Sequence, residues 1–190
     1  MSTFFVIIVS LIILQRLIEL AIAKNNEKYM YSLGGYEVGA EHYKYIVILH
    51  TTFFISLISE VYFSQRSMPG WWKITFSIFV FAQVLRGWCL ASLGRFWNTK
   101  IIVLPAAEVV RKGPYKLLRH PNYLVVITEL LVLPLTFGAF YTAIIMSAVN
   151  ALLLTIRIRT EEKALAGICE YDEIMRYIPR FIPVKRQKIE

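Results

Sequence analysis

The sequence predicts an all-α integral membrane protein with about five transmembrane helices. Two features of the composition support this fold class: 57% of the 190 residues are hydrophobic, and the mean hydropathy is +0.54. Both values lie far above those of a soluble globular domain. In addition, the apolar residues form five runs, and most lysines and arginines lie at the ends of these runs. That distribution is typical of a membrane protein.

The first predicted span is Thr3 to Ala23, an apolar run interrupted by a few polar residues. At a rise of 1.5 Å per residue it can cross about 30 Å of hydrocarbon. It lacks a basic start and is too long to be the apolar core of a cleaved signal peptide. Arg16 and Glu19 are three residues apart on one helical face, so they pair with each other or face the interior of a bundle.

The second and third predicted spans each carry one polar residue that needs an explanation. A polar connection, Lys24 to Lys44, leads to the second span, Tyr45 to Phe63, in which His50 is either a structural hydrogen-bonding residue or a catalytic one. The third span, Trp71 to Leu93, opens with tryptophans that suit the membrane interface. Its Arg86 requires a carboxylate or a water-lined cavity. The candidate carboxylates are Glu19, Glu60 and Glu129.

The second half of the chain begins with a long polar passage, Gly94 to Asn122. A short apolar piece follows, Tyr123 to Leu135, in which Pro134 is expected to break the helix. The fifth span, Phe140 to Ile156, continues without a helix breaker into a charged segment, so its helix is expected to leave the membrane intact. We therefore divide the chain into residues 1–93, with three helices, and residues 94–190, with two more helices and a cytoplasmic C-terminal helix.

The distribution of lysine and arginine predicts the orientation. With an N-terminus outside, 17 of these residues lie on the cytoplasmic side: three after the first span, six after the third and eight in the C-terminal segment. Two lie on the other side, and Arg16 and Arg86 lie within spans. The positive-inside rule therefore predicts a cytoplasmic C-terminus. Because the cations cluster at the ends of spans, the net charge of +8 indicates membrane lipid and not nucleic acid as the partner.

The polar stretch GPYKLLRHPNY, Gly113 to Tyr123, is the first candidate site. Pro114 and Pro121 fix their own φ angles and restrict the residues before them, so this segment is preset and not floppy. Tyr115 and His120 offer aromatic surface and hydrogen bonds to a ring system and a hydroxylated sugar. The alternative is an interfacial loop whose cations meet lipid phosphates.

The second candidate site is RIRTEE, Arg157 to Glu162. Arg157 and Glu161 are four residues apart and share a helical face. At the membrane boundary a fixed Arg–Glu pair is expected to orient an anionic substrate, because the dielectric is lower there. The alternative is a solvated helix end with snorkelling cations.

Several common kinds of site are missing from the sequence. It has no GxGxxG or GxxxxGK motif, no HExxH or other metal-ligand grouping, and no GxSxG motif. Cys89 and Cys169 show no CxxC spacing and are expected to be free thiols. Nucleotide-binding α/β folds, metal-dependent hydrolysis and serine hydrolysis are therefore disfavoured, and no metal is expected.

GPYKLLRHPNY, followed by RIRTEEKAL and a tyrosine-rich tail, resembles the isoprenylcysteine carboxyl methyltransferase family over Leu93 to Pro183. The family consists of multi-span membrane enzymes that use S-adenosylmethionine without a Rossmann fold. The stretches QRLIELAIAKNNE and LGRFWNTKIIVLP resemble most the small bacterial branch that acts on alkylpyrones, products of type III polyketide synthases.

The resemblance implies a site for S-adenosyl-L-methionine in the C-terminal region. A strand-like stretch, Ala107 to Val110, would line the adenosine through its backbone, although many relatives have histidine where this chain has Ala107. Arg157 would bind the oxygen anion of the substrate and Glu161 would hold the cofactor, so both count as catalytic. The implied cofactor contacts are Lys100, Ala107, Glu108, Val109, Val110, Tyr115, His120, Pro121, Asn122, Tyr123 and Glu161.

The resemblance implies an O-methyltransferase for a lipophilic small molecule, an alkylpyrone or alkylresorcinol. A carboxylate or an acidic pyrone enol is already ionised at neutral pH, so no strong general base is needed. The lipid tail would enter from the bilayer and the cofactor from the cytoplasm. Alternatives are a prenylcysteine carboxylate or a phospholipid amine as acceptor, or a non-catalytic membrane scaffold. No obligate protein partner is inferred.

Overall fold

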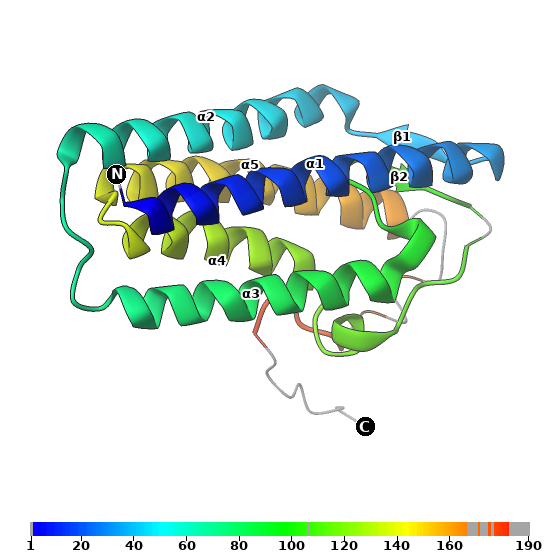
Figure 1. Cartoon of the computed structure of the whole chain (residues 1–190). Helices are drawn as coiled ribbons and strands as arrows, with labels where there is room; N and C mark the ends of the chain where they lie inside the picture. The colour runs from blue at the N-terminus through cyan, green and yellow to red at the C-terminus, as the bar shows by residue number, and fades with distance from the viewer. Residues whose placement is uncertain (1, 106, 167–170, 172–174, 176, 183–190) are drawn as a thin grey trace.

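The protein is a bundle of five helices in which each helix runs antiparallel to the one before it (Figure 1). A computed structural model describes residues 2–105, 107–166, 171, 175 and 177–182. The helices are α1 Thr3–Ser32, α2 Ala40–Ser64, α3 Trp72–Leu93, α4 Pro121–Thr136 and α5 Phe140–Ala166. Short elements are the strands β1 Tyr36–Val38 and β2 Ile101–Val103 and the 3₁₀ turns η1 Gly94–Phe96 and η2 Gly113–Lys116.

Four of the helices are long and apolar enough to cross a membrane, namely α1, α2, α3 and α5. The predicted fold class, a helical membrane protein, is confirmed to that extent. The fifth helix, α4, has 16 residues, which correspond to about 24 Å and fall short of a typical hydrocarbon core. Pro134 does not break α4 before its end, because it lies in the last turn. As predicted, α5 continues without a break through the charged segment, to Ala166.

Two local expectations were wrong. The connection after the first span is not polar loop throughout: α1 continues to Ser32, because Lys24 to Ser32 contains neither glycine nor proline. The fold is also not purely helical, since β1 and β2 form an antiparallel pair in which Tyr36 lies opposite Val103. That pairing uses Ile101–Val103, and the predicted strand-like stretch Ala107 to Val110 has no regular secondary structure.

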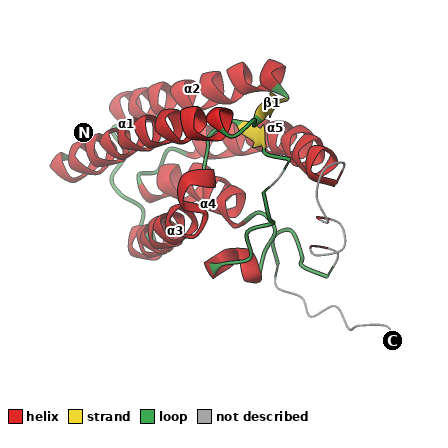
Figure 2. Ribbon diagram, turned by 90° about the vertical axis from the view of Figure 1, so that its right-hand side faces the viewer, coloured by secondary structure: helices red, strands yellow, loops and turns green. Residues whose placement is uncertain are grey.

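The connections that carry the candidate sites lie at one end of the bundle. In Figure 1 the N-terminus and the α2–α3 and α4–α5 connections are at the left, whereas β1, β2 and the passage before α4 are at the right. The turned view in Figure 2 shows the strands beside α5. The segment Gly113 to Tyr123 and the end of α5 therefore lie at the same end of the bundle. The predicted C-terminal helix falls almost entirely outside the described residues.

The hydrophobic core fills the opposite end of the bundle and consists mainly of aromatic and branched side chains. Phe5 of α1 meets Phe137 edge to face at a centroid distance of 4.8 Å, and Phe53, Leu57 and Leu133 are buried with them. Such packing against α1, α2 and α4 fixes the helices at this end. It leaves the other end available for polar side chains.

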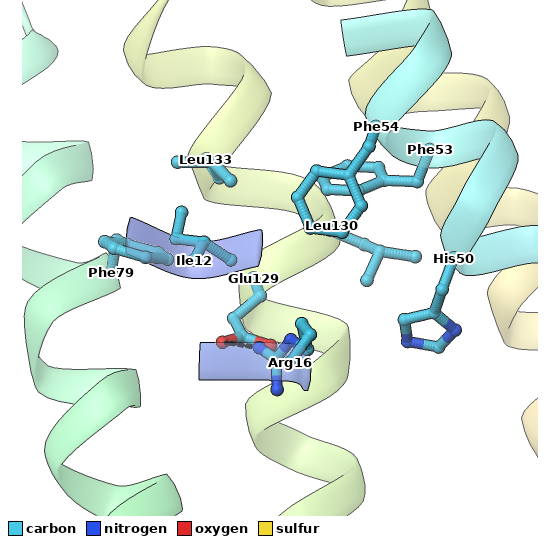
Figure 3. Close-up of a pocket in the computed structure, with 9 residues that line it drawn as sticks. All are labelled: Ile12, Arg16, His50, Phe53, Phe54, Phe79, Glu129, Leu130 and Leu133. Carbon is cyan, nitrogen blue, oxygen red and sulfur yellow. Dashed lines mark hydrogen bonds and ion pairs between the residues drawn. The ribbon is translucent and has the colours of Figure 1, made fainter. Parts of the chain in front are cut away.

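Four charged side chains lie midway along the bundle, and together they carry no net charge: Glu19, Arg86 and Glu129 are buried and Arg16 is half-buried. Arg16 donates to Glu19 at 2.5 Å and to Glu129 at 2.7 Å, and Figure 3 shows Arg16 beside Glu129. Arg86 of α3 contacts Glu19 at 3.3 Å and also pairs with Glu129. Of the three carboxylates proposed for Arg86, Glu60 is not a partner, because it accepts from the backbone N–H groups of residues 141 and 142 and so caps α5.

The network is expected to stabilise the bundle through charge balance. Replacing Glu129 with leucine leaves two arginines with one carboxylate, which should cost about 3–5 kcal/mol. The double variant Arg86→Met with Glu129→Leu keeps the balanced pair of Arg16 and Glu19 and should recover much of this loss. Thermal unfolding in detergent measures both, with the exposed Glu41→Gln as control. A double variant no more stable than Glu129→Leu alone would contradict this explanation.

Candidate functional site

A cavity of about 540 Å³ connects the polar end of the bundle with the apolar surfaces of α1 and α2. At its polar end it is lined by Tyr123 of α4 and by Arg157 and Glu161 of α5. Further along, its walls are apolar residues such as Leu17 of α1 and Ile55 of α2. A single cavity therefore offers charged groups at one end and hydrocarbon at the other.

The phenol of Tyr123 is the centre of the polar end. Its hydroxyl donates to Glu161 and accepts from Nε of Arg157 at 2.8 Å. Arg157 and Glu161, the predicted catalytic pair, therefore do not form the direct ion pair expected from their spacing. The reason is that Tyr123 lies between them and binds both.

The guanidinium of Arg157 is buried but not fully used. Besides Tyr123 it donates from Nη2 to the backbone carbonyl of Thr99, and its side chain is 8% exposed. A guanidinium has five N–H donors, and no described residue accepts from Nη1. Arg157 can therefore bind an additional anionic or carbonyl oxygen in the cavity without giving up its present partners.

His120 lines the same cavity, and its ring also contacts an ion pair formed by Glu162 and Arg180. Its Nε2 lies 3.0 Å from Glu162, and its ring stacks on that of Tyr123 at 5.3 Å. Arg180 pairs with both oxygens of Glu162, at 2.9 and 2.6 Å. In addition, the backbone N–H of Arg119 donates to Pro179 O. This clamp ties the loop before α4 to the end of α5 and to the segment around Arg180.

Lys100 and Tyr115 line the cavity as protonated groups. The ammonium of Lys100 lies 2.8 Å from Glu27 and 3.1 Å from Glu37, and the hydrogen bond to Glu27 raises the pKa of Lys100. Burial raises the pKa of the Tyr115 phenol, which lies beside Cys89. Neither group can therefore act as a base at neutral pH.

Gly113 allows the loop that carries Tyr115 to approach α3. Its φ of +52° is unfavourable for other residues, and a Cβ atom there would lie 2.1 Å from Oγ of Ser92. The glycine of the motif is therefore required by space as well as by backbone conformation.

Asn122 has an unsatisfied polar atom. Its Oδ1 is buried without a partner among the described residues, and the residue lines the cavity. Buried carbonyl oxygens normally accept a hydrogen bond. Its neighbour Pro121 is buried as the first residue of α4 and does not line the cavity.

The remaining predicted contacts, Ala107, Glu108, Val109 and Val110, also do not line the cavity. Val109 packs instead against a small cluster that contains Tyr171, Met175 and Ile178. Their contact with a cofactor stays a prediction.

Sequence reasoning missed three residues at this site. Thr99 offers its backbone carbonyl to Arg157, and Glu162 and Arg180 hold His120. Glu162 directly follows Glu161, and this position indicated that it lies near the site. Nothing in the sequence predicted that Glu162 pairs with His120 and Arg180.

His50 is half-buried and lines the cavity, whereas Cys89 is fully buried. Nδ1 of His50 lies 2.9 Å from the carbonyl oxygen of Ile46 and therefore carries a proton, which agrees with the structural alternative. Cys89 is a buried free thiol, and Cys169 lies outside the described residues. Within the described part of the chain, no group of three or more His, Cys, Asp or Glu side chains could hold a metal ion.

Comparison with known proteins gives related chains but no related structure. The chain is 45% identical over 161 residues to YpbQ of Bacillus subtilis, an uncharacterized protein, and the match covers 85% of this chain and 96% of YpbQ. It is 30% identical over 154 residues to an uncharacterized protein of Haemophilus influenzae, covering 80% and 90% of the two chains. No solved structure matches at a significant level.

A more distant relative has a different description. The cobalt-zinc-cadmium resistance protein CzcN of Cupriavidus metallidurans is 28% identical over 129 residues, which cover 67% of this chain and 58% of CzcN. The family model for "Isoprenylcysteine carboxyl methyltransferase (ICMT) family" matches residues 74–167, a range that contains Tyr123, Arg157 and Glu161. This match, together with the four membrane-length helices found among the described residues, supports a membrane methyltransferase of the isoprenylcysteine carboxyl methyltransferase family.

Proposed function

We propose that this protein is an S-adenosyl-L-methionine-dependent O-methyltransferase that acts on a lipophilic acceptor, an alkylpyrone or alkylresorcinol. The observation that carries this proposal is the continuity of the cavity. It begins at Arg157, Tyr123 and Glu161 and extends to Leu17 and Ile55 within the membrane-length helices. A polar head group and a hydrocarbon chain can therefore occupy one site.

The apolar part of the cavity supports entry from the lipid phase. Leu17 is 59% exposed and Ile55 is 61% exposed although both line the cavity. Side chains that belong to both a cavity and the outer surface mark a wall that is thin or open. We infer that the alkyl chain passes between α1 and α2, where the surrounding medium is hydrocarbon.

The residues at the polar end fit the proposed cofactor. The unsatisfied Oδ1 of Asn122 can accept from a hydroxyl or amine, and His120 and Tyr123 supply aromatic surface. Glu161 supplies a negative charge for a cationic group. When bound, S-adenosylmethionine would supply a methyl group on a positively charged sulfur. Lys100 and Tyr115 line the same end and are further candidates to hold it.

Arg157 is proposed to bind the acceptor through its unused N–H groups. Its contacts with Tyr123 and with Thr99 O fix the guanidinium before a ligand arrives. A positioned donor of this kind orients an anionic oxygen while leaving another lone pair free to react.

The protonated states of Lys100 and Tyr115 favour an acceptor that is already ionised. An acidic enol or a carboxylate meets this condition. A phospholipid amine would first have to lose a proton to a base, whereas an ionised acceptor needs no base. This distinction supports O-methylation over N-methylation.

Methylated lipid should form when the purified protein is incubated with labelled S-adenosylmethionine and a bacterial lipid extract. Mass spectrometry of the labelled product then identifies the acceptor. We expect methyl ethers of alkylpyrones or alkylresorcinols. Labelled prenylcysteine esters or N-methylated phospholipids would contradict the proposed acceptor, and absence of any labelled lipid would contradict the activity.

Replacing Arg157 with alanine should lower turnover by about 100- to 1,000-fold, which is typical for loss of one positioned donor. The affinity for S-adenosylhomocysteine, measured by calorimetry, should change little. Arg159→Ala is the matched control, because Arg159 lies half a turn away on the same helix and is exposed. Near-normal methylation by Arg157→Ala would remove Arg157 from the site.

Replacing Asn122 with alanine should weaken binding of S-adenosylhomocysteine by about tenfold, which corresponds to one hydrogen bond. The melting temperature should not fall, because Oδ1 has no partner among the residues that the structure describes. The control is Asn25→Ala, which changes an exposed asparagine of α1. A fall in melting temperature with unchanged affinity would show that Asn122 has only a structural role.

A further inference from the structure

Trp97, between η1 and β2, has a polar group that the fold does not use. The residue is 3% exposed and lines the cavity. Its Nε1 is buried, and no described residue accepts its proton. An indole N–H can only donate, and leaving such a donor unpaired costs about 1–3 kcal/mol.

The backbone around Trp97 is firmly held, so the orphan N–H is not a consequence of a loose loop. The backbone carbonyl oxygen of Trp97 accepts from Nδ2 of Asn26 at 2.7 Å. The backbone N–H of Trp97 donates to the carbonyl oxygen of Gly94 at 3.2 Å. The next side chain, Asn98, donates to Ala23 O at 3.1 Å. The indole is therefore positioned in advance by contacts with α1.

The same loop also holds Arg157. Thr99, two residues after Trp97, accepts from Nη2 of Arg157. Two residues span at most about 7 Å, so the backbone of Trp97 lies close to the carbonyl that fixes the guanidinium. One short loop therefore carries both the residue with the unpaired donor and the carbonyl that fixes Arg157, and Trp97 and Arg157 line the same cavity.

We propose that Trp97 is a specificity-determining residue that donates its indole N–H to a second oxygen of the methyl acceptor. The inference rests on the proposed function and narrows its substrate class. The acceptor then has two oxygens on one head group: an ionised oxygen at Arg157 and a carbonyl oxygen at Trp97. An alkyl hydroxypyrone has this pattern, because its enol and its ring carbonyl are conjugated and share the negative charge.

The acceptor is a better partner for Trp97 than the cofactor is. Trp97 is attached to α1 through Asn26, and α1 also supplies apolar walls of the cavity such as Leu17. Of the residues proposed to hold the cofactor, His120 and Asn122 lie at the start of α4. Lys100 lies on the same loop as Trp97, but its ammonium is already paired with Glu27 and Glu37. The indole therefore belongs to the wall that also contacts the alkyl chain.

The test compares two ligands with the same alkyl chain, an alkyl hydroxypyrone and an alkylphenol, which lacks the second oxygen. Dissociation constants are measured in detergent with S-adenosylhomocysteine present. We expect Trp97→Phe to weaken hydroxypyrone binding about tenfold, because its carbonyl oxygen carries part of the charge. Alkylphenol binding should change less than about twofold, and S-adenosylhomocysteine binding should not change.

Trp71→Phe is the matched control, because this substitution also removes an indole N–H. Trp71 is 50% exposed and lies at the other end of α3. It should leave all three affinities unchanged. Equal weakening of both ligands by Trp97→Phe, or no weakening of either, would overturn the inference. So would a selective loss of S-adenosylhomocysteine affinity, because the donor would then serve the cofactor.

Two further measurements keep the inference testable. If Trp97→Phe does not fold, replacing Trp97 with benzothienylalanine exchanges N–H for sulfur at nearly the same size and should give the same selective loss. The wild-type protein must also methylate the hydroxypyrone. If it does so and the variants show no selective loss, only the inference fails, whereas absence of methylation by the wild type contradicts the proposed function itself.

Discussion

The bundle depends on the balance of four charges in an apolar setting. Arg16, Glu19, Arg86 and Glu129 come from α1, α3 and α4, and removing any one of them would leave a buried charge without an opposite partner. Their mutual pairing is the arrangement that lowers the cost of burial. Because Arg16, Glu19 and Arg86 also line the large cavity, the same network that fixes three helices forms part of the wall of the candidate site. The proposed methyl transfer to an ionised oxygen needs no proton relay, so a structural role accounts for the network.

From this network towards the polar end, the residues that line the cavity change from mainly apolar side chains to charged and polar ones. Tyr123 marks the boundary, since its ring packs with His120 while its hydroxyl binds both Arg157 and Glu161. The clamp of Glu162 and Arg180 holds that boundary from the outside. Neither GPYKLLRHPNY nor RIRTEE forms the site alone: the first supplies Tyr123, and the second supplies both of its charged partners.

The sequence predicts the helices well, because runs of 20 apolar residues and the absence of breakers are local properties. It also predicts that Arg157, Glu161 and Tyr123 belong to one region. It does not predict which carboxylates meet Arg86, since Glu129 lies 43 residues away and the choice depends on tertiary packing. The bridging position of Tyr123 is hidden for the same reason, and i,i+4 spacing alone favoured a direct Arg157–Glu161 pair. The strand at Ile101–Val103 was missed because three residues form no recognisable pattern until β1 lies beside them.

Electrostatics at the polar end restrict which ligands can bind together. Arg157 and Glu161 are both bound by Tyr123, so the protein alone has one positive and one negative side chain in balance. If the ligands bind as proposed, an anionic acceptor at Arg157 and a cationic cofactor group at Glu161 preserve this balance, whereas a neutral amine acceptor would leave one net positive charge in a cavity of low dielectric. Two bound charges of opposite sign are therefore the combination that the cavity tolerates best.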